Sequence, residues 1–372
     1  MKRIMGRAMG WFSRFLRWCC GCFGFKKGGS KAVAGPFFFG KRCLSQKYLL
    51  KYIAGEAFKG SQGDVYGYST APDSRRKIPV KETNVIVKTE DSNGNKMINE
   101  YVRECKIGTG SYGKVVLYRN TKDGKLYALK VLHKYRLSKV RVAPTETALT
   151  DVLREVEIMK TVEHPNIVNL VEVIDDPNTD QLCMVLEYVE GRWIFEGSGP
   201  AGGLGEDTAR VYFRDVLQGL IYLHNCNIVH GDIKPENLLV TSNGRVKICD
   251  FSVSRMFKES NDELRRSPGT PVYTAPECCV GVTYHGKRAD VWALGVTLYC
   301  MVLGHYPFIG HTLQDIYNKI VHDPLLLPED MNPELANLLE GLLCKDPNQR
   351  MKLDAAARHP WVVKVNASTL PD

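Results

Sequence analysis

No stretch of this 372-residue chain approaches the run of about 18 apolar residues that a membrane-spanning helix requires. Proline accounts for only 18 residues, an ordinary share, and the chain is 44% hydrophobic and 24% charged. This composition excludes a collagen, a coiled coil and a wholly disordered chain. The length allows one large domain with an extension, or two medium domains.

The chain contains 12 cysteines, but their distribution does not indicate a disulfide framework. Eight are scattered beyond position 100, often inside apolar runs, where cysteine behaves as a small hydrophobic residue. This distribution indicates a reducing environment. We therefore expect a hydrophobic core, and not cross-links, to hold the fold together.

Acidic residues are absent from the first 55 positions, which contain 12 of the 50 lysines and arginines. The remaining 38 basic residues face 41 acidic ones, so the net charge of +9 comes entirely from the N-terminal segment. The position of charge matters more than its sum. We therefore expect no nucleic-acid-binding core.

The N-terminal segment has a basic amphipathic pattern over residues 3–18, with aromatic and aliphatic side chains on one side and arginines on the other. Cys19, Cys20 and Cys22 follow, and then Lys26-Lys27. This arrangement suits an interfacial helix reinforced by S-acylation, with peripheral membrane contact through residues 3–27. A disordered tail and an organellar transit peptide are alternatives.

The chain from about Gly60 to Asn99 is polar and rich in turn-forming residues, which is typical of a linker. We expect residues 1–100 to form a largely disordered extension. The folded domain is expected over 101–361, followed by a short tail at 362–372.

Three glycines at positions 1, 3 and 6 of a short loop mark the start of this domain: Gly108, Gly110 and Gly113. Such glycines let a backbone approach phosphates closely and donate its amides to them. A dinucleotide-binding fingerprint would open a helix, but here strands are predicted at 114–120 and 126–132, joined by a turn at Asp123-Gly124. The loop is therefore expected to join two strands.

Lys130 lies 17 residues after Gly113, on the second of these strands, where its ammonium group can meet phosphate oxygens. A helix is predicted over Thr150–Lys160, and its Glu155 can pair with Lys130 and orient it. Taken singly, each of these residues could also be an ordinary surface charge.

Further along, Asp232, Lys234 and Asn237 occupy one short loop, and Asp250 follows 13 residues after Asn237. Asp232 can accept or orient the proton of an attacking hydroxyl, and Lys234 can neutralise a phosphoryl group in transfer. Asn237 and Asp250 offer the oxygen ligands that Mg²⁺ prefers.

The ordered set of motifs from Tyr101 to Trp361 resembles the eukaryotic protein kinases. The resemblance implies an α+β, bilobal fold with a small β-rich N-lobe, a larger helical C-lobe, and ATP with Mg²⁺ in the cleft. It also implies a Glu277–Arg350 ion pair and an Asp290 that braces the catalytic loop. The nucleotide-contacting residues that it implies are Ile107, Gly108, Thr109, Gly110, Ser111, Tyr112, Gly113, Lys114, Val115, Ala128, Lys130, Glu187, Val189 and Leu239.

Lys234 and the segment Gly269–Thr274 look like those of serine/threonine kinases. The resemblance implies that a threonine at the position of Thr274 hydrogen-bonds around the catalytic aspartate and lysine.

Two residues depart from the family pattern. Gly231 stands where the family usually has an arginine that pairs with an activation-loop phosphate, so we expect activity that does not depend on that switch. Ser252 stands where the metal-binding motif usually ends in glycine, so we expect Asp250 to flip less easily.

Segments 134–147 and 164–177 look like those of the calcium/calmodulin-dependent kinase kinases, and 263–271 resembles the plant geminivirus Rep-interacting kinases. That resemblance implies phosphorylation of the activation-loop threonine of a sucrose-nonfermenting-related kinase, contact with the viral Rep protein, and a cytoplasmic location with nuclear entry left open. Ser267 and Thr270 are candidate phosphosites. A nucleotide-binding pseudokinase scaffold and an active kinase with a membrane-associated substrate are the alternatives.

Overall fold

The structure is a computed structural model that describes residues 76–364, apart from residues 111, 259–260, 266–268 and 282. The amphipathic helix expected at 3–18, the membrane contact through 3–27, and the candidate phosphosite Ser267 lie outside the described residues. Across the part of the chain that is described, no helix is long and apolar enough to cross a bilayer.

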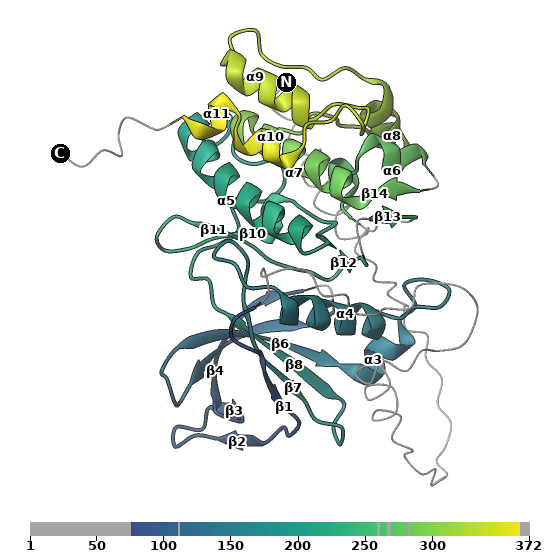
Figure 1. The fold of residues 1–372 in the computed structure, drawn as a ribbon. Coiled ribbons are helices and arrows are strands. Elements are labelled where there is room, and N and C mark those ends of the chain that lie inside the picture. Colours follow the sequence, from purple (N-terminus) through teal and green to yellow (C-terminus); the bar gives the residue numbers. More distant parts are fainter. Residues whose placement is uncertain (1–75, 111, 259–260, 266–268, 282, 365–372) are drawn as a thin grey trace, which may run out of the picture. The chain divides into compact units, whose positions relative to one another are not determined.

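An eight-stranded sheet forms the first half of the described chain, with the strand order β1-β7-β8-β6-β5-β4-β3-β2. Neighbouring strands are antiparallel except for β1 and β7, which run parallel. Figure 1 shows helix α4 lying along this sheet. The elements are β1 Lys81–Thr83, β2 Lys88–Glu90, β3 Lys96–Ile98, β4 Tyr101–Thr109, β5 Lys114–Asn120, β6 Leu126–His133, α3 Lys134–Lys139, α4 Ala148–Thr161, β7 Leu170–Asp175 and β8 Gln181–Glu187.

The second half of the described chain is mainly helical, with three two-stranded pairs, β10–β11, β12–β9 and β13–β14. This order of a strand-rich part followed by a helical part confirms the expected fold class. The elements are α5 Glu206–Asn225, β9 Ile228–Val229, β10 Leu238–Val240, β11 Val246–Ile248, β12 Arg255–Met256, β13 Glu263–Leu264, α6 Pro276–Val280, β14 Tyr284–His285, α7 Gly286–Leu303, α8 Leu313–His322, α9 Pro333–Leu342, α10 Leu353–Ala357 and α11 Pro360–Val363, with short 3₁₀ turns at Pro235–Asn237 and Pro271–Tyr273.

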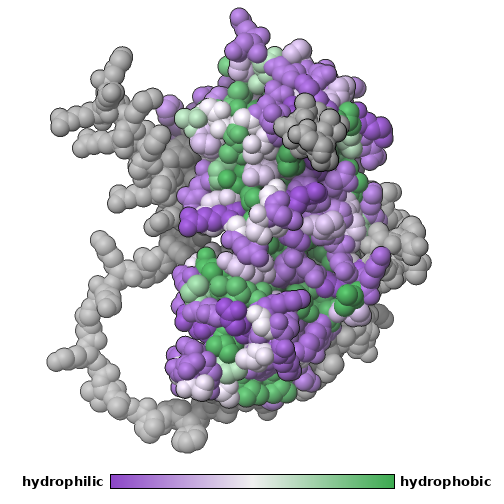
Figure 2. Space-filling model, turned by 90° about the vertical axis from the view of Figure 1, so that its left-hand side faces the viewer, coloured by the Kyte–Doolittle hydropathy of each residue, from purple (hydrophilic) through white to green (hydrophobic). Residues whose placement is uncertain are grey.

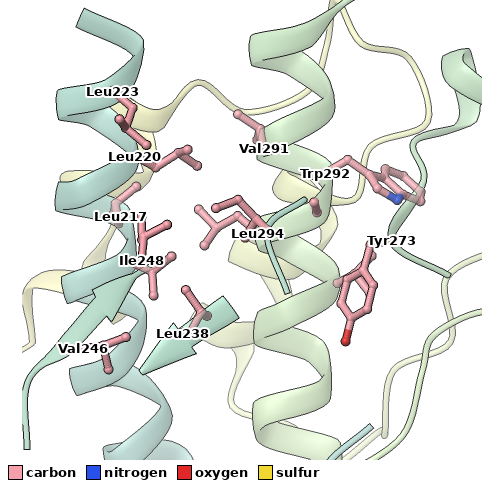
Figure 3. Packing of buried hydrophobic residues seen from close by; sticks show 14 of the residues in the cluster. Leu217, Leu220, Leu223, Leu238, Val246, Ile248, Tyr273, Val291, Trp292 and Leu294 are labelled. Atoms are coloured by element: carbon pink, nitrogen blue, oxygen red, sulfur yellow. The ribbon is translucent and has the colours of Figure 1, made fainter. Parts of the chain in front are cut away.

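The main hydrophobic core lies where α5 and α7 enclose the β10–β11 hairpin. Figure 3 shows Leu217 and Leu220 of α5 facing Ile248 of β11, with Leu294 of α7 beside them. These side chains are at most 1% exposed, and burying each one contributes about 2 kcal/mol. The hairpin begins directly after Asn237 and ends two residues before Asp250, so this packing fixes the C-terminal end of the catalytic loop and the start of the segment that carries Asp250.

The surface is largely polar on the face drawn in Figure 2, where hydrophilic residues predominate and hydrophobic residues form separate patches. Scattered exposed apolar residues are normal for a folded domain and need no partner to explain them.

Residues 76–99 belong to the folded domain, contrary to the expectation of a polar linker. β1 adds to β7 at one edge of the sheet, and the β2–β3 hairpin adds to β4 at the other. Glu172 of β7 is fully buried and binds this segment through Lys81 Nζ at 2.9 Å and the Thr83 hydroxyl at 2.5 Å. Strands of three residues are too short to show an alternating pattern, which is why the sequence did not predict them.

Arg76 links residues 76–99 to the C-terminal end of α4 and to the start of β7 by hydrogen bonds. Its guanidinium donates to the carbonyl oxygens of Met159, Val162 and Leu170, at 3.4, 3.2 and 2.6 Å. Because charged donors are worth more than neutral ones, we expect Arg76→Met to lower the free energy of unfolding by about 2 kcal/mol in urea titrations. Lys77→Met, an exposed neighbour, is the control, and an equal loss in both variants would contradict this role for Arg76.

Candidate active site

Lys130 of β6 and Glu155 of α4 form a buried ion pair, with Nζ at 2.7 and 2.9 Å from the two carboxylate oxygens. The side chains are 6% and 2% exposed. Burial alone would lower the pKa of Lys130, but the charges of Glu155 and Asp250 raise it. The ammonium group therefore stays charged and points into the site between the sheet and the helical part.

The helix that carries Glu155 begins at Ala148, with Thr147 at its N-cap and reciprocal contacts between Thr147 and Thr150. Val152 and Val156 are buried against the core, as the periodicity predicted. The Glu155 side chain is also buried, at 2% exposure. The predicted helix at 150–160 is confirmed, with two residues more at its start and one at its end.

The glycine loop joins β4 to β5, two antiparallel strands, so it is not the start of a helix. Its turn is closed by a hydrogen bond from the Gly110 amide to the Gly113 carbonyl at 2.8 Å. A Cβ atom on Gly113 would lie 2.5 Å from the Val131 carbonyl oxygen, so no side chain fits there. The loop thus lies directly over the strand that carries Lys130. Ser111 at its tip is outside the described residues.

The Asp232 carboxylate is held by three neighbours. It accepts from the Asn237 amide at 3.0 Å and from the Thr270 hydroxyl and backbone amide at 2.9 and 3.1 Å, and Lys234 Nζ lies 2.6 Å away. Lys234 also donates to the Thr270 hydroxyl at 2.8 Å. One carboxylate oxygen and one ammonium group are thereby fixed side by side at the surface of the helical part.

The threonine in this network is Thr270, and the expectation for Thr274 is wrong. Thr274 instead directs its hydroxyl to the Thr270 carbonyl, at 3.4 Å. The 3₁₀ turn at Pro271–Tyr273 separates the two threonines and turns only the first toward Asp232. The Gly-Thr-Pro order is the signal in the sequence that would have identified it.

Thr270 is also unsuited to be a phosphosite in this arrangement. Its hydroxyl is engaged by Asp232 and Lys234, and a phosphate there would place about two negative charges beside the Asp232 carboxylate. Of the two candidates, Ser267 lies outside the described residues and stays a prediction.

Asp290 of α7 braces the catalytic loop, as the family resemblance implied. Its carboxylate accepts from the backbone amides of His230 and Gly231 at 2.9 and 2.8 Å, and from His224 at 2.9 Å. Gly231 has a φ of 80°, in the left-handed region that costs glycine least. The glycine that replaces the family's usual arginine thus fits the backbone that Asp290 holds.

Asp250 has a φ of 62°, the left-handed conformation that non-glycine residues rarely adopt. Ser252 is not among the described residues with positive φ, so its side chain imposes no backbone strain at that position, and the less easy flipping of Asp250 stays a prediction. Burial opposes the ionisation of Asp250, but the Lys130 charge and hydrogen bonds from Ser252 outweigh it and lower the pKa of Asp250. The carboxylate is therefore ionised at neutral pH.

Asn237 and Asp250 fit a hard divalent cation by the chemistry of their donors. The amide nitrogen of Asn237 donates to the Asp232 carbonyl and carboxylate at 2.9 and 3.0 Å, so its amide oxygen is the atom left for a metal ion. The backbone amide of Cys249 donates to the Asn237 carbonyl at 2.9 Å and keeps the two segments adjacent.

The resemblance to the protein kinases also implies a hinge near Glu187–Val189, which lies at the end of β8. The Glu187 carboxylate accepts from the Asn169 backbone amide at 2.7 Å and from Lys247 Nζ at 2.9 Å, so this side chain fixes the end of β8. Val189 is 7% exposed, and Leu239 of β10 bridges to Trp193. The sequence motifs did not predict this contact, because Trp193 lies outside all of them.

The expected Glu277–Arg350 ion pair is present. The two guanidinium nitrogens lie 2.7 and 2.8 Å from the two carboxylate oxygens, and the Arg350 side chain is fully buried. This pair joins the segment that follows Thr270 to the chain after α9.

Comparison with known proteins gives the family directly. Residues 101–362 match the protein kinase domain. The chain is 69% and 66% identical to the serine/threonine-protein kinases GRIK1 and GRIK2 of Arabidopsis thaliana, over 287 and 290 residues, which is 77% of this chain and 72% and 71% of theirs. It is 43% identical over 288 residues to the calcium/calmodulin-dependent protein kinase kinase of Caenorhabditis elegans, covering 72% of this chain and 53% of that one. The chain belongs to the protein kinase family and is a serine/threonine kinase that uses ATP.

Proposed function

We propose that this kinase phosphorylates the activation-loop threonine of a sucrose-nonfermenting-related kinase. The similarity to GRIK1 and GRIK2, together with the kinase-kinase likeness at 43% identity, is the observation that supports this substrate. A contact with the viral Rep protein, and a cytoplasmic location with entry into the nucleus, are proposed on the same likeness.

In the proposed mechanism, Lys130 and the amides of the glycine loop position the phosphates of ATP, and Glu155 holds Lys130 in place. Asp250 and the amide oxygen of Asn237 would hold Mg²⁺, which when bound neutralises charge on the phosphate oxygens. These roles rest on the geometry around each side chain and on the family resemblance.

Asp232 is proposed to orient the substrate hydroxyl and accept its proton as the new O–P bond forms and the bond to ADP breaks. Lys234 lies 2.6 Å from Asp232 and offsets the negative charge that develops on the γ-phosphoryl oxygens. Thr270 contacts both groups and fixes their relative position.

The experiment that tests the substrate uses a catalytically dead sucrose-nonfermenting-related kinase domain, with Mg²⁺ and labelled ATP. We expect label in the domain with an intact activation-loop threonine, none after Thr→Ala in that loop, and recovery after Thr→Ser. Equal labelling of the alanine domain would contradict the proposed acceptor. Nucleotide binding without transfer to any protein would favour the pseudokinase scaffold.

A further inference from the structure

Four charged side chains and one tyrosine meet at the first turn of α4. Asp151 Oδ2 accepts from the Tyr112 hydroxyl at 3.2 Å, and Asp151 Oδ1 accepts from Arg154 at 2.7 Å. Arg255 Nη2 lies 3.6 Å from the same Oδ1. Glu146 accepts from Arg154 at 2.7 Å and lies 4.0 Å from Arg255. The charges of two carboxylates and two guanidinium groups thus cancel, and the Asp151 carboxylate lies at the centre of the cluster.

These residues come from three separate parts of the chain. Tyr112 belongs to the glycine loop, Asp151 to α4, and Arg255 to β12, five residues after Asp250. Asp151 is 6% exposed, so its carboxylate has lost most of its water and depends on these partners. One buried charge therefore couples the loop over the nucleotide, the helix that carries Glu155, and the segment that carries Asp250.

Arg255 is itself fixed by the backbone. Its Nη1 donates to the carbonyl oxygens of Val253 and Ser254 at 3.2 and 3.0 Å, and β12 pairs with β9 immediately before His230. The guanidinium position is therefore set by the strand that leads into the catalytic loop. Any shift of α4 away from β12 would separate Asp151 from this fixed cation.

Glu155 lies four residues after Asp151, which places the two carboxylates about one helical turn apart. A restraint on Asp151 consequently restrains Glu155 and, through it, Lys130. Tyr112 adds a restraint on the glycine loop from the same carboxylate, and burial together with Asp151 raises the pKa of Tyr112 to about 12, so that the hydroxyl keeps its proton and remains a donor.

Gly231 has no guanidinium group that could bind a phosphate on the activation segment. The Asp151–Arg255 contact nevertheless joins α4 to the segment after Asp250. We propose that the Asp151–Arg255 pair, with Tyr112, is a latch that holds α4 inward and the glycine loop closed without any phosphate on the activation segment. Asp151, Arg255 and Tyr112 are then positioning residues, not catalytic ones. This inference goes beyond the proposed substrate, and it rests on the proposed roles of Lys130 and Glu155.

The test compares the full chain, treated with phosphatase until mass spectrometry finds no phosphate, with Arg255→Met, Asp151→Asn and the double variant. A generic serine/threonine peptide is the substrate, so that failure of the proposed kinase substrate does not interfere. We expect the dephosphorylated wild type to remain active and each single variant to lose about tenfold in kcat/KM for ATP, within the usual range for a coupling between sites. The kcat/KM of the double variant should be no lower than that of the less active single variant, because both substitutions remove the same interaction.

Arg255→Lys should recover most of the loss, since a cation then remains within reach of Asp151, and Tyr112→Phe should raise the KM for ATP with little change in kcat. Arg245→Met is the matched control: it breaks another arginine–aspartate pair, with Asp215 at 2.6 Å, away from α4. Its kcat/KM should equal that of the wild type.

Hydrogen exchange of the α4 amides gives a second measurement, independent of phosphate transfer. With an ATP analogue bound, these amides should exchange faster in Arg255→Met than in the wild type and in Arg245→Met. The latch is overturned by loss of wild-type activity on dephosphorylation, by single effects that multiply in the double variant, or by unchanged α4 exchange in Arg255→Met. A wild type that transfers no phosphate would refute the catalytic roles, and α4 exchange would still decide the latch.

Discussion

Asp232→Asn will lower kcat by about 10²–10⁴-fold, the usual contribution of a positioned general base, while ATP binds as before. Asparagine keeps the size of the side chain and can still accept from the Thr270 amide, now 3.1 Å away. It lacks the charge that lies 2.6 Å from Lys234 and cannot accept the proton of the substrate hydroxyl. The chemical step should therefore fail in a site that is otherwise intact.

Labelled phosphate transfer measures kcat in this experiment, and a separate binding titration measures the Kd for ATP. The control is Asp354→Asn, an exposed aspartate in the first turn of α10, which should leave both quantities unchanged. If Asp232→Asn keeps its kcat, the proton acceptor is another group. If ATP binding is lost together with kcat, Asp232 shapes the nucleotide site itself.

Arg350→Met will lower the free energy of unfolding by about 3–5 kcal/mol, the cost of breaking a buried ion pair by removing one partner. The guanidinium donates to both oxygens of Glu277 and to the carbonyl oxygens of Cys344 and Arg288, at 2.7–3.0 Å. Methionine has a similar length but no donor, so the Glu277 carboxylate and two carbonyl groups would lose their partner at once.

Thermal unfolding checks this prediction, with an expected fall in Tm on the order of 10 °C for a domain of this size. The control is Arg119→Met, which breaks an exposed pair with Glu104 at 2.9 Å, with side chains 51% and 38% exposed. Exposed pairs contribute little, so its Tm should stay within about 2 °C of the wild type. Equal shifts in the two variants would show that burial does not set the strength of the Arg350 pair.

Local patterns in the sequence predicted the elements around the nucleotide well. The strand predicted at 114–120 is β5, and the strand at 126–132 is β6 with one more residue. Glycines at the loop and an Asp-Gly turn bound these strands, and aliphatic and tyrosine side chains make up much of them. Short-range signals were sufficient there because each element is bounded by residues with strong conformational preferences.

Contacts between distant parts of the chain could not be predicted in this way. Thr270 and Thr274 are four residues apart, and only the turn between them decides which hydroxyl meets Asp232. Tyr112, Asp151 and Arg255 are separated by 39 and 104 positions and share no motif. Their meeting depends on how α4, the sheet and β12 pack, which is a property of the tertiary structure.

The parallel pairing of β1 with β7 has a consequence for where the folded unit begins. β7 would otherwise be the edge strand of the sheet, with a row of unpaired amide and carbonyl groups open to another chain. Lys81 of β1 also places a charge on that edge, which is a common protection against edge-to-edge association. A fragment cut at residue 101, where the family match begins, would expose this edge and leave Glu172 with Tyr101 alone among the partners described here. Residues that precede the family match thus cover an edge at which the sheet could otherwise pair with another chain.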